Sequence, residues 1–118
     1  MPKILIADDD TTMLGLLTTL MELEGNQVVT VTRPEDIIPA VRREGPALIL
    51  MDYHLAGGDA MGPLVELKQS EDLKRIPVVV TSGMDRETVC LRAGAESFLL
   101  KPFRPAQLLA KIHELSEP

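Results

Sequence analysis

Five short apolar runs, each the size of a buried β-strand, recur along this chain and alternate with helical patterns. The runs are rich in Ile, Leu and Val and several end abruptly in polar residues, as strands buried on both faces do. They cover residues 3–7, 27–31, 47–51, 77–81 and 96–100. This alternation predicts one α/β domain over residues 1–118, a doubly wound five-stranded parallel sheet with helices on both faces.

Helical signals fill the segments between the predicted strands. Thr11 or Thr12 is expected to cap the first helix, Asp10 is a further candidate for that role, and Gly25 would end the helix. Pro34 suits the start of a short second helix that Pro39 would kink or delay. Four apolar residues at helical spacing are predicted to form the buried face of the first helix: Met13, Leu16, Leu17 and Leu20.

Composition excludes several classes of function. The chain has twelve Lys and Arg against eighteen Asp and Glu, a net charge of −6, and lacks the basic stripe that binding of nucleic acid requires. The apolar runs are too short to cross a bilayer, and the first residues lack a signal-peptide pattern. A single cysteine, Cys90, is expected to be a small buried residue and fits a reducing compartment. We therefore expect a cytoplasmic protein without membrane or direct nucleic-acid partners.

Polar and charged residues follow four of the five predicted strands. Asp8 and Asp9 end the first, Asp52 the third, Ser82 the fourth and Lys101 the fifth. Ligands of open parallel sheets bind at this carboxyl edge, so these side chains are expected to meet there. Clustered carboxylates repel unless a cation neutralises them, and Mg²⁺ prefers such oxygen ligands. With a lysine suited to a phosphoryl oxygen, the pattern predicts a magnesium-assisted phosphoryl site with an aspartate as nucleophile.

Four motifs in this order resemble the signature of response-regulator receiver domains: Asp8-Asp9, Asp52, Ser82-Gly83 and Lys101-Pro102-Phe103. The resemblance covers nearly the whole chain and implies the flavodoxin-like strand order 2-1-3-4-5. It implies a signalling switch of a two-component phosphorelay rather than an enzyme that turns over an external substrate. Such a switch assists only its own phosphorylation and dephosphorylation.

The resemblance also implies a role for each site residue. Asp52 would accept a phosphoryl group from a sensor histidine kinase or a phosphotransfer protein. The implied Mg²⁺ ligands are Asp8, Asp9, Asp52 and the backbone carbonyl of His54. Three further implied roles are Ser82 as switch hydroxyl, Lys101 as phosphoryl-binding group and Phe98 as switch aromatic. Movement of Ser82 would let Phe98 enter from the surface and change the face formed by the fourth and fifth strands and their helices.

The chain departs from the family pattern in two places. Ala56 stands where receivers usually have proline, and Ala60 where they usually have glycine, so the loop that includes Gly57 and Gly58 is expected to be more mobile. This would alter the lifetime of the phosphorylated state. Only eleven residues separate Ser82 from the glycine at position 94, about three fewer than in typical members, or nearly one helical turn. The fourth helix is therefore expected to be short or irregular.

Alternatives remain at the level of residues and of function. Thr81 competes with Ser82 because neighbouring strand residues face opposite ways, although the spacing from Asp52 favours Ser82. The departures motivate a non-switching interaction module of the same fold. A small Mg²⁺-dependent phosphohydrolase with an aspartyl-phosphate intermediate is less favoured, because such enzymes need an acid where His54 stands. The cognate kinase, the output, a homodimer and a longer parent protein are left open by the sequence.

Overall fold

A parallel sheet forms the centre of the protein, in a computed structural model that describes residues 2–116. Its strands are β1 (Lys3–Ala7), β2 (Gln27–Val31), β3 (Leu48–Asp52), β6 (Val78–Ser82) and β7 (Ser97–Leu100). They follow the order β2-β1-β3-β6-β7, and each neighbouring pair is parallel. The predicted order 2-1-3-4-5 is confirmed, with β6 and β7 as the fourth and fifth strands of the sheet.

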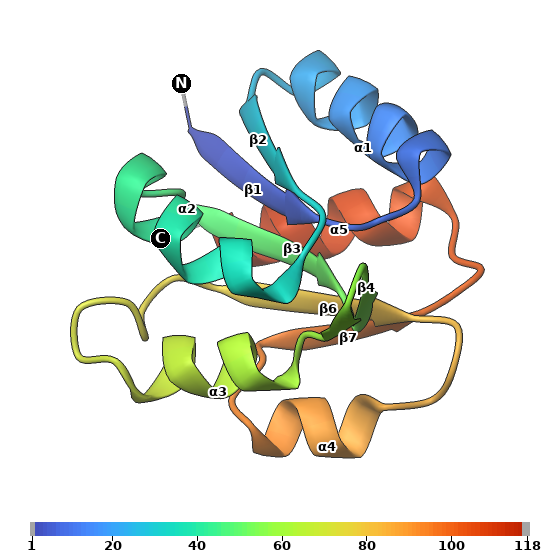
Figure 1. Cartoon of the computed structure of the whole chain (residues 1–118). Coiled ribbons are helices and arrows are strands. Elements are labelled where there is room, and N and C mark those ends of the chain that lie inside the picture. The colour runs from blue at the N-terminus through green and yellow to red at the C-terminus, as the bar shows by residue number, and fades with distance from the viewer. Residues whose placement is uncertain (1, 117–118) are drawn as a thin grey trace.

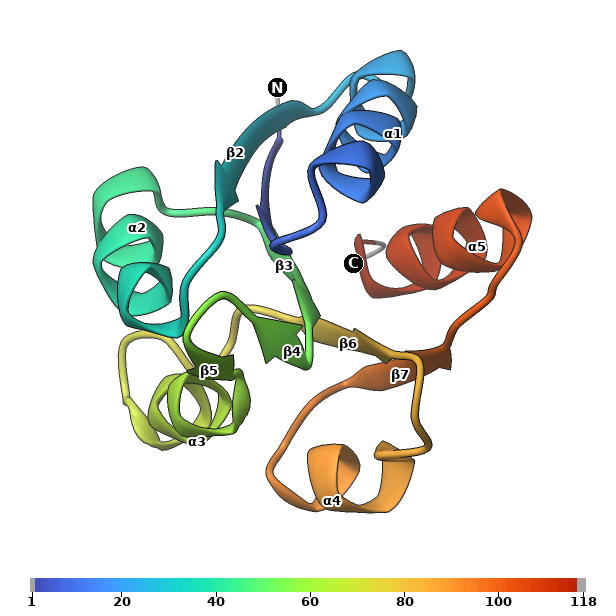
Figure 2. The ribbon, with the colours of Figure 1, turned by 45° about the vertical axis from the view of Figure 1, so that its right-hand side comes forward.

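Helices cover both faces of the sheet: α1 (Thr11–Leu23), α2 (Ile37–Glu44), α3 (Met61–Gln69), α4 (Glu87–Arg92) and α5 (Pro105–Ser116). α1 and α5 lie on one face, and α2, α3 and α4 lie on the other (Figure 1, Figure 2). Successive side chains of a strand point to opposite faces. In β1, Ile6 packs in the cluster beneath α1 and α5, whereas Leu5 packs in the cluster beneath the other three helices. The buried core therefore has two halves, one on each side of the sheet.

In the first helix one of the candidate caps is confirmed, and one residue of the predicted buried face is exposed. Asp10, rather than a threonine, is its N-cap, and the Asp10 carboxylate accepts hydrogen bonds from the amides of Thr12 and Met13. A carboxylate at this position also faces the positive end of the helix dipole, which a threonine hydroxyl matches less well. Leu16, expected to be buried, is 53% exposed. The helix buries Leu17, as predicted, together with Met21, which lies one turn further along and was not among the predicted residues.

Proline places the second helix as expected. Pro34 opens a 3-10 turn, η1 (Pro34–Asp36), and α2 begins only at Ile37. Pro39 lies in the first turn of α2, where a backbone N–H has no acceptor within the helix. Pro39 therefore removes no hydrogen bond from α2. Of the two expected effects of Pro39, a kink or a delayed start, the structure shows the later start of the helix. The expectation of a short fourth helix is also confirmed, since α4 spans six residues.

A hairpin that the sequence pattern does not indicate follows β3. It consists of β4 (His54–Leu55) paired antiparallel with β5 (Gly58–Asp59). Gly57 forms the turn with a φ of +88°, a conformation that glycine adopts without strain. The amide of Ala56 donates to the carbonyl of Thr32, which ties the hairpin to the end of β2. The structure thus shows an ordered turn here, and the expected mobility of this loop stays a prediction.

A partly buried lysine joins α3 to the two last strands of the sheet. The Lys68 side chain is 9% exposed, and its ammonium donates to the carbonyls of Lys74 and Ile76 and to the carboxylate of Glu96. Glu96 in turn accepts the amide of Val78 at 2.7 Å. A Cβ at Gly94 would lie 2.8 Å from the Lys68 side chain, so glycine leaves room for this lysine. The three ammonium protons are all used.

Lys68→Met is expected to lower the free energy of unfolding by about 1–3 kcal/mol, because it leaves a carboxylate and two carbonyls without their donor. Urea denaturation measures the loss. Lys74→Met is the matched control, since its ion pair with Glu71 is exposed and is worth at most about 1 kcal/mol. Equal losses in the two variants would contradict a structural role for Lys68.

Candidate functional site

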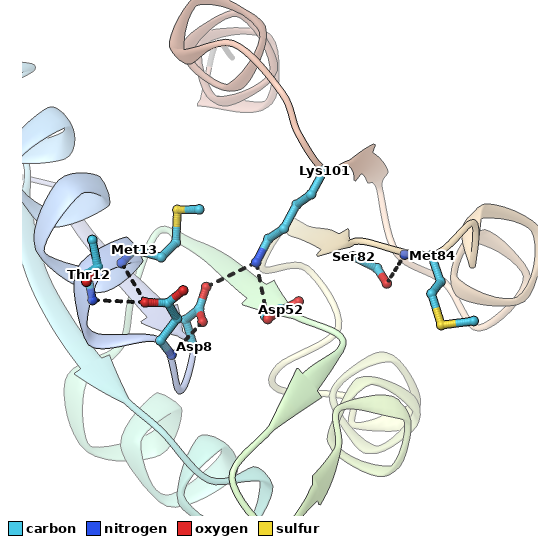
Figure 3. A network of polar contacts seen from close by, with 8 residues as sticks. Asp8, Thr12, Met13, Asp52, Ser82, Met84 and Lys101 are labelled. Atoms are coloured by element: carbon cyan, nitrogen blue, oxygen red, sulfur yellow. Dashed lines mark hydrogen bonds and ion pairs between the residues drawn. The ribbon is translucent and has the colours of Figure 1, made fainter.

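Three of the predicted site residues converge at the carboxyl edge of the sheet. Asp52 ends β3, and Asp8 follows β1 immediately. β1 and β3 are neighbours in register, with Ala7 opposite Met51, so the next residue of each strand brings the two carboxylates together. Lys101 follows β7 and reaches across the end of β6 to both of them (Figure 3). The topology therefore produces the predicted cluster.

Lys101 lies between the two buried carboxylates. Its Nζ is 3.3 Å from Oδ2 of Asp52 and 3.6 Å from Oδ2 of Asp8. Asp8 is 2% exposed and Asp52 is 8% exposed. Buried charges are costly unless they are paired, so the ammonium compensates part of the repulsion between the two acids. The site therefore combines two buried acids with one positive charge.

The acidic cluster has the composition of a site for a hard divalent cation. Carboxylate oxygens of Asp8, Asp9 and Asp52 all lie within 4.8 Å of one another, and Asp9 is the exposed member. Mg²⁺ prefers oxygen ligands and keeps several of its waters, which suits a site open on one side. The residues present therefore fit the metal that the resemblance implies, and these three side chains would hold it.

The pKa of Asp8 reflects the same crowding. Burial raises the pKa of this carboxyl above its ordinary value of 3.8, and the neighbouring Asp52 adds to the rise. The amide of Asp10 and the ammonium of Lys101 act in the opposite direction. An acid whose pKa is raised by folding binds a proton more readily in the folded state. The metal-free protein thus bears the full cost of this charge above the folded-state pKa, and the cost falls as the pH drops toward 3.8.

Asp8→Asn is expected to raise the free energy of unfolding of the metal-free protein at pH 7 by about 1–2 kcal/mol, because one of three repelling carboxylates is removed. Urea denaturation in a chelator at pH 7 and pH 5 measures this gain, which should shrink at the lower pH. Asp59→Asn is the control, since it removes the same charge from an exposed hairpin residue outside the acidic cluster. A loss of stability in Asp8→Asn at pH 7 would be the opposite of this expectation.

Ser82 lies close to the acids in the fold, but its hydroxyl is engaged elsewhere. Ser82 Oγ accepts the backbone amide of Met84 at 3.1 Å, and Figure 3 shows it turned toward Met84 rather than toward Asp52. Its competitor Thr81 is the ladder partner of Asp52. Both side chains are buried, so burial does not separate them. The role of Ser82 as switch hydroxyl stays a prediction that requires its hydroxyl to turn.

Phe98 differs from the expected surface position. It is 8% exposed and packs in the cluster beneath α2, α3 and α4. Phe98 is the ladder partner of Val80, two residues before Ser82, so Phe98 and Ser82 share one face of neighbouring strands. The aromatic ring is thus already inside in this structure, because its strand position directs it to the apolar core. Its part in switching stays a prediction.

His54 lies in the hairpin at the rim of the site. Its ring is exposed and meets the ring of Tyr53 edge to face, with centroids 5.0 Å apart. A lone histidine is a poor metal site, so the predicted contact with Mg²⁺ is through the backbone carbonyl. Because His54 lies two residues after Asp52, we expect its side chain to affect the access of water to the acids.

His54→Ala is therefore expected to change the rate at which a phosphoryl group is lost by about 3–10-fold, since it alters water access, and to leave Mg²⁺ affinity within about twofold. Loss of the phosphorylated form is followed by intact mass, and Mg²⁺ binding by calorimetry. A large fall in Mg²⁺ affinity would show that the ring itself binds metal.

Sequence reasoning missed two residues next to the site. The amide of Met84 holds Ser82, a local turn in which a serine accepts the amide two residues on. Tyr53 connects the site to its surroundings, because its amide donates to Thr81 and its carbonyl accepts from Ala60. The Ser82-Gly83 pair is a weak sequence signal for the turn that joins Ser82 to Met84. The contacts of Tyr53 join distant segments and have no sequence signal.

Comparison with known proteins agrees with this geometry. The sequence profile of the response regulator receiver domain matches residues 4–113. Protein PilH of Pseudomonas aeruginosa is 32% identical over 96% of this chain and 96% of its own length. The two-component response regulator-like protein APRR1 of Arabidopsis thaliana is 37% identical over 91% of this chain. The chain belongs to the response regulator receiver domain family.

A solved structure shows the same fold. The beryllofluoride-activated receiver domain of RstA from Klebsiella pneumoniae superposes with a TM-score of 0.88 at 28% identity, covering 98% of this chain and 99% of that one. Several curated relatives are longer: this chain spans 18% of APRR1 and about half of other regulators. No helix among residues 2–116 combines the length and hydropathy that a membrane crossing needs.

Proposed function

We propose that this chain is the phosphorylated switch of a two-component phosphorelay and that Asp52 is its phosphoacceptor. The observation that carries the proposal is the position of Lys101, whose ammonium lies between the carboxylates of Asp52 and Asp8 in a cluster of three acids. The membership of the receiver family supports it. One carboxylate would be enough to pair with a lysine that only stabilises the fold. The second buried acid beside Lys101 is better explained by binding of a metal and a phosphoryl group.

The proposed reaction is a phosphoryl transfer to a carboxylate. One oxygen of Asp52 attacks phosphorus while the P–N bond of a phosphohistidine breaks, and the electron pair of that bond passes to the imidazole, which takes up a proton. Lys101 would move only a short distance to bind a phosphoryl oxygen as a point charge. Asp8 and Asp9 would hold Mg²⁺ with Asp52 and the carbonyl of His54. The metal would neutralise charge that develops on the transferred group.

The proposed signal is a change of surface that follows the added charge. A phosphoryl group brings about −1.5 to −2 charges and three strong acceptors to Asp52. Ser82 would leave the amide of Met84 and donate to a phosphoryl oxygen, and the face formed by β6, α4, β7 and α5 would adjust. This is a population shift that needs contacts present in only one state. The hydroxyl bond to Met84 is such a contact.

The partner we propose is a sensor histidine kinase or a phosphotransfer protein, in the cytoplasm. We propose no turnover of an external substrate. The downstream partner, whether a separate protein, a fused domain or a second copy, stays open. A non-switching module of the same fold is the second candidate, favoured by the six residues of α4 and by Ala56 and Ala60 in the loop after Asp52.

Intact-mass measurement with acetyl phosphate tests the proposal. One phosphoryl group should be added in Mg²⁺ and none in a chelator. Absence of an adduct, with absence of beryllofluoride binding, would favour the non-switching module. Continuous release of phosphate from p-nitrophenyl phosphate would instead indicate a phosphohydrolase.

A further inference from the structure

Arg86 lies immediately before α4 and has no role in the proposed phosphoryl site. α4 has six residues, less than two turns, and only Cys90 among them is buried. Its N-cap residue is Arg86, which forms no side-chain capping bond. Helices this short depend on tertiary contacts for their position. The contacts of Arg86 therefore matter for where α4 lies.

Arg86 reaches back to the residue that is covalently bonded to Asp52. Its guanidinium carbon lies 5.0 Å from the centre of the Tyr53 ring, within the range of a cation–π contact. The Tyr53 backbone is fixed on both sides, since its amide donates to Thr81 and its carbonyl accepts from Ala60, both at 2.8 Å. The ring is thus a firm support beside the acceptor.

A second path joins the same loop to the proposed switch hydroxyl. Ser82 Oγ accepts the amide of Met84, and the Met84 sulfur lies 3.9 Å from Nη2 of Arg86. Residues 82–86 therefore form a closed arrangement with Asp52 and Tyr53: one end is held at Ser82, and the other at the Tyr53 ring. If Ser82 turns to a phosphoryl group, the support of Met84 is lost at once.

One hydrogen-bond donor of the Arg86 side chain also lacks an acceptor. Its Nε is buried and has no hydrogen-bond partner among residues 2–116. A buried donor without an acceptor is unfavourable, so the present position of the Arg86 side chain carries a cost that its ring contact must offset. The contacts of Arg86 with Tyr53 and Met84, together with its unpaired Nε, are those expected if the loop before α4 has two positions and this is one of them.

We infer that Arg86 is a positioning residue that couples Asp52 to α4: its contact with Tyr53 holds residues 83–86 and the start of α4 in the unphosphorylated position. The inference rests on the proposed function, because the coupling is defined by what binds at Asp52. Because Ser82 and Arg86 hold the two ends of the same loop, we expect the turn of Ser82 toward an occupied site to displace this contact. The contact therefore opposes occupancy, and removing it should favour occupancy.

Binding of beryllofluoride with Mg²⁺, followed by ¹⁹F NMR, tests this coupling. Arg86→Met and Tyr53→Leu should each bind beryllofluoride about 2–10-fold more tightly than the natural chain. The double variant should match the single variants rather than multiply their effects, because both remove one contact. Arg86→Lys keeps a cation over the ring and should restore affinity to within about twofold. Arg92→Met, an exposed change in the same helix, should have no effect.

Hydrogen exchange of residues 87–92 supplies the structural readout. Without beryllofluoride, these amides should exchange faster in Arg86→Met than in the natural chain, and with it the two should become alike. If Arg86→Met does not fold, Arg86→Gln carries the same expectation. Unchanged affinity in folded variants, or single effects that multiply, would overturn the inference alone. A natural chain that binds no beryllofluoride would overturn the proposed function together with it.

Discussion

Asp52→Asn is expected to take up no phosphoryl group from acetyl phosphate under conditions that fully convert the natural chain. The amide lacks the negatively charged oxygen that attacks phosphorus, so the loss should be complete rather than partial. Asparagine has nearly the same shape, and Asp52 is buried beside Lys101, so the fold should persist. Intact mass, with circular dichroism for the fold, makes the measurement.

Two further readouts sharpen this prediction. Mg²⁺ affinity should fall, because one of the three clustered carboxylates is lost. Asp59→Asn is a suitable control, since Asp59 lies in the nearby hairpin and caps the amide of Met61 without joining the cluster. A full adduct on Asp52→Asn would place the acceptor on another residue.

Lys101→Met is expected to slow phosphoryl uptake by about 10²–10³-fold, because the transferred group loses its positive partner in a partly buried site. The same change should leave Mg²⁺ affinity equal or higher, since a cation that repels the metal is removed. The two effects therefore run in opposite directions. Rates come from intact mass over time, and affinity from calorimetry.

Lys74→Met is again the control, because its ammonium is exposed and pairs with Glu71 rather than with Asp8 or Asp52. Parallel losses of rate and of Mg²⁺ affinity in Lys101→Met would indicate that Lys101 shapes the metal site instead of binding the phosphoryl group. Metal-free stability should also fall in this variant, because two buried carboxylates, Asp8 and Asp52, lose the charge between them.

The sheet and the central acids could be predicted because their signals are local. Buried parallel strands are short apolar runs, and Asp8, Asp52 and Lys101 each end such a run, so topology alone brings them to one edge. Strand alternation then determines the face, as in β1, where Ile6 and Leu5 enter opposite halves of the core. These features need no knowledge of tertiary packing.

The remaining features depend on contacts between distant segments. Leu16 fits the helical period of α1, yet it is exposed, because α5 and the sheet cover Leu17 and Met21 instead. The Lys68 network and the contact of Arg86 with Tyr53 join residues far apart in the sequence. No pattern within a window of one helix or strand contains that information.

Reductive trapping with borohydride locates the phosphoryl group and decides whether Asp52 is the phosphoacceptor. Borohydride converts an aspartyl phosphate to homoserine, which peptide mass spectrometry then assigns to one residue. After treatment with acetyl phosphate and Mg²⁺, we expect homoserine at position 52 alone, and none when a chelator replaces Mg²⁺. Homoserine at position 8 or 9, or trapping that does not depend on Mg²⁺, would contradict Asp52 as the phosphoacceptor.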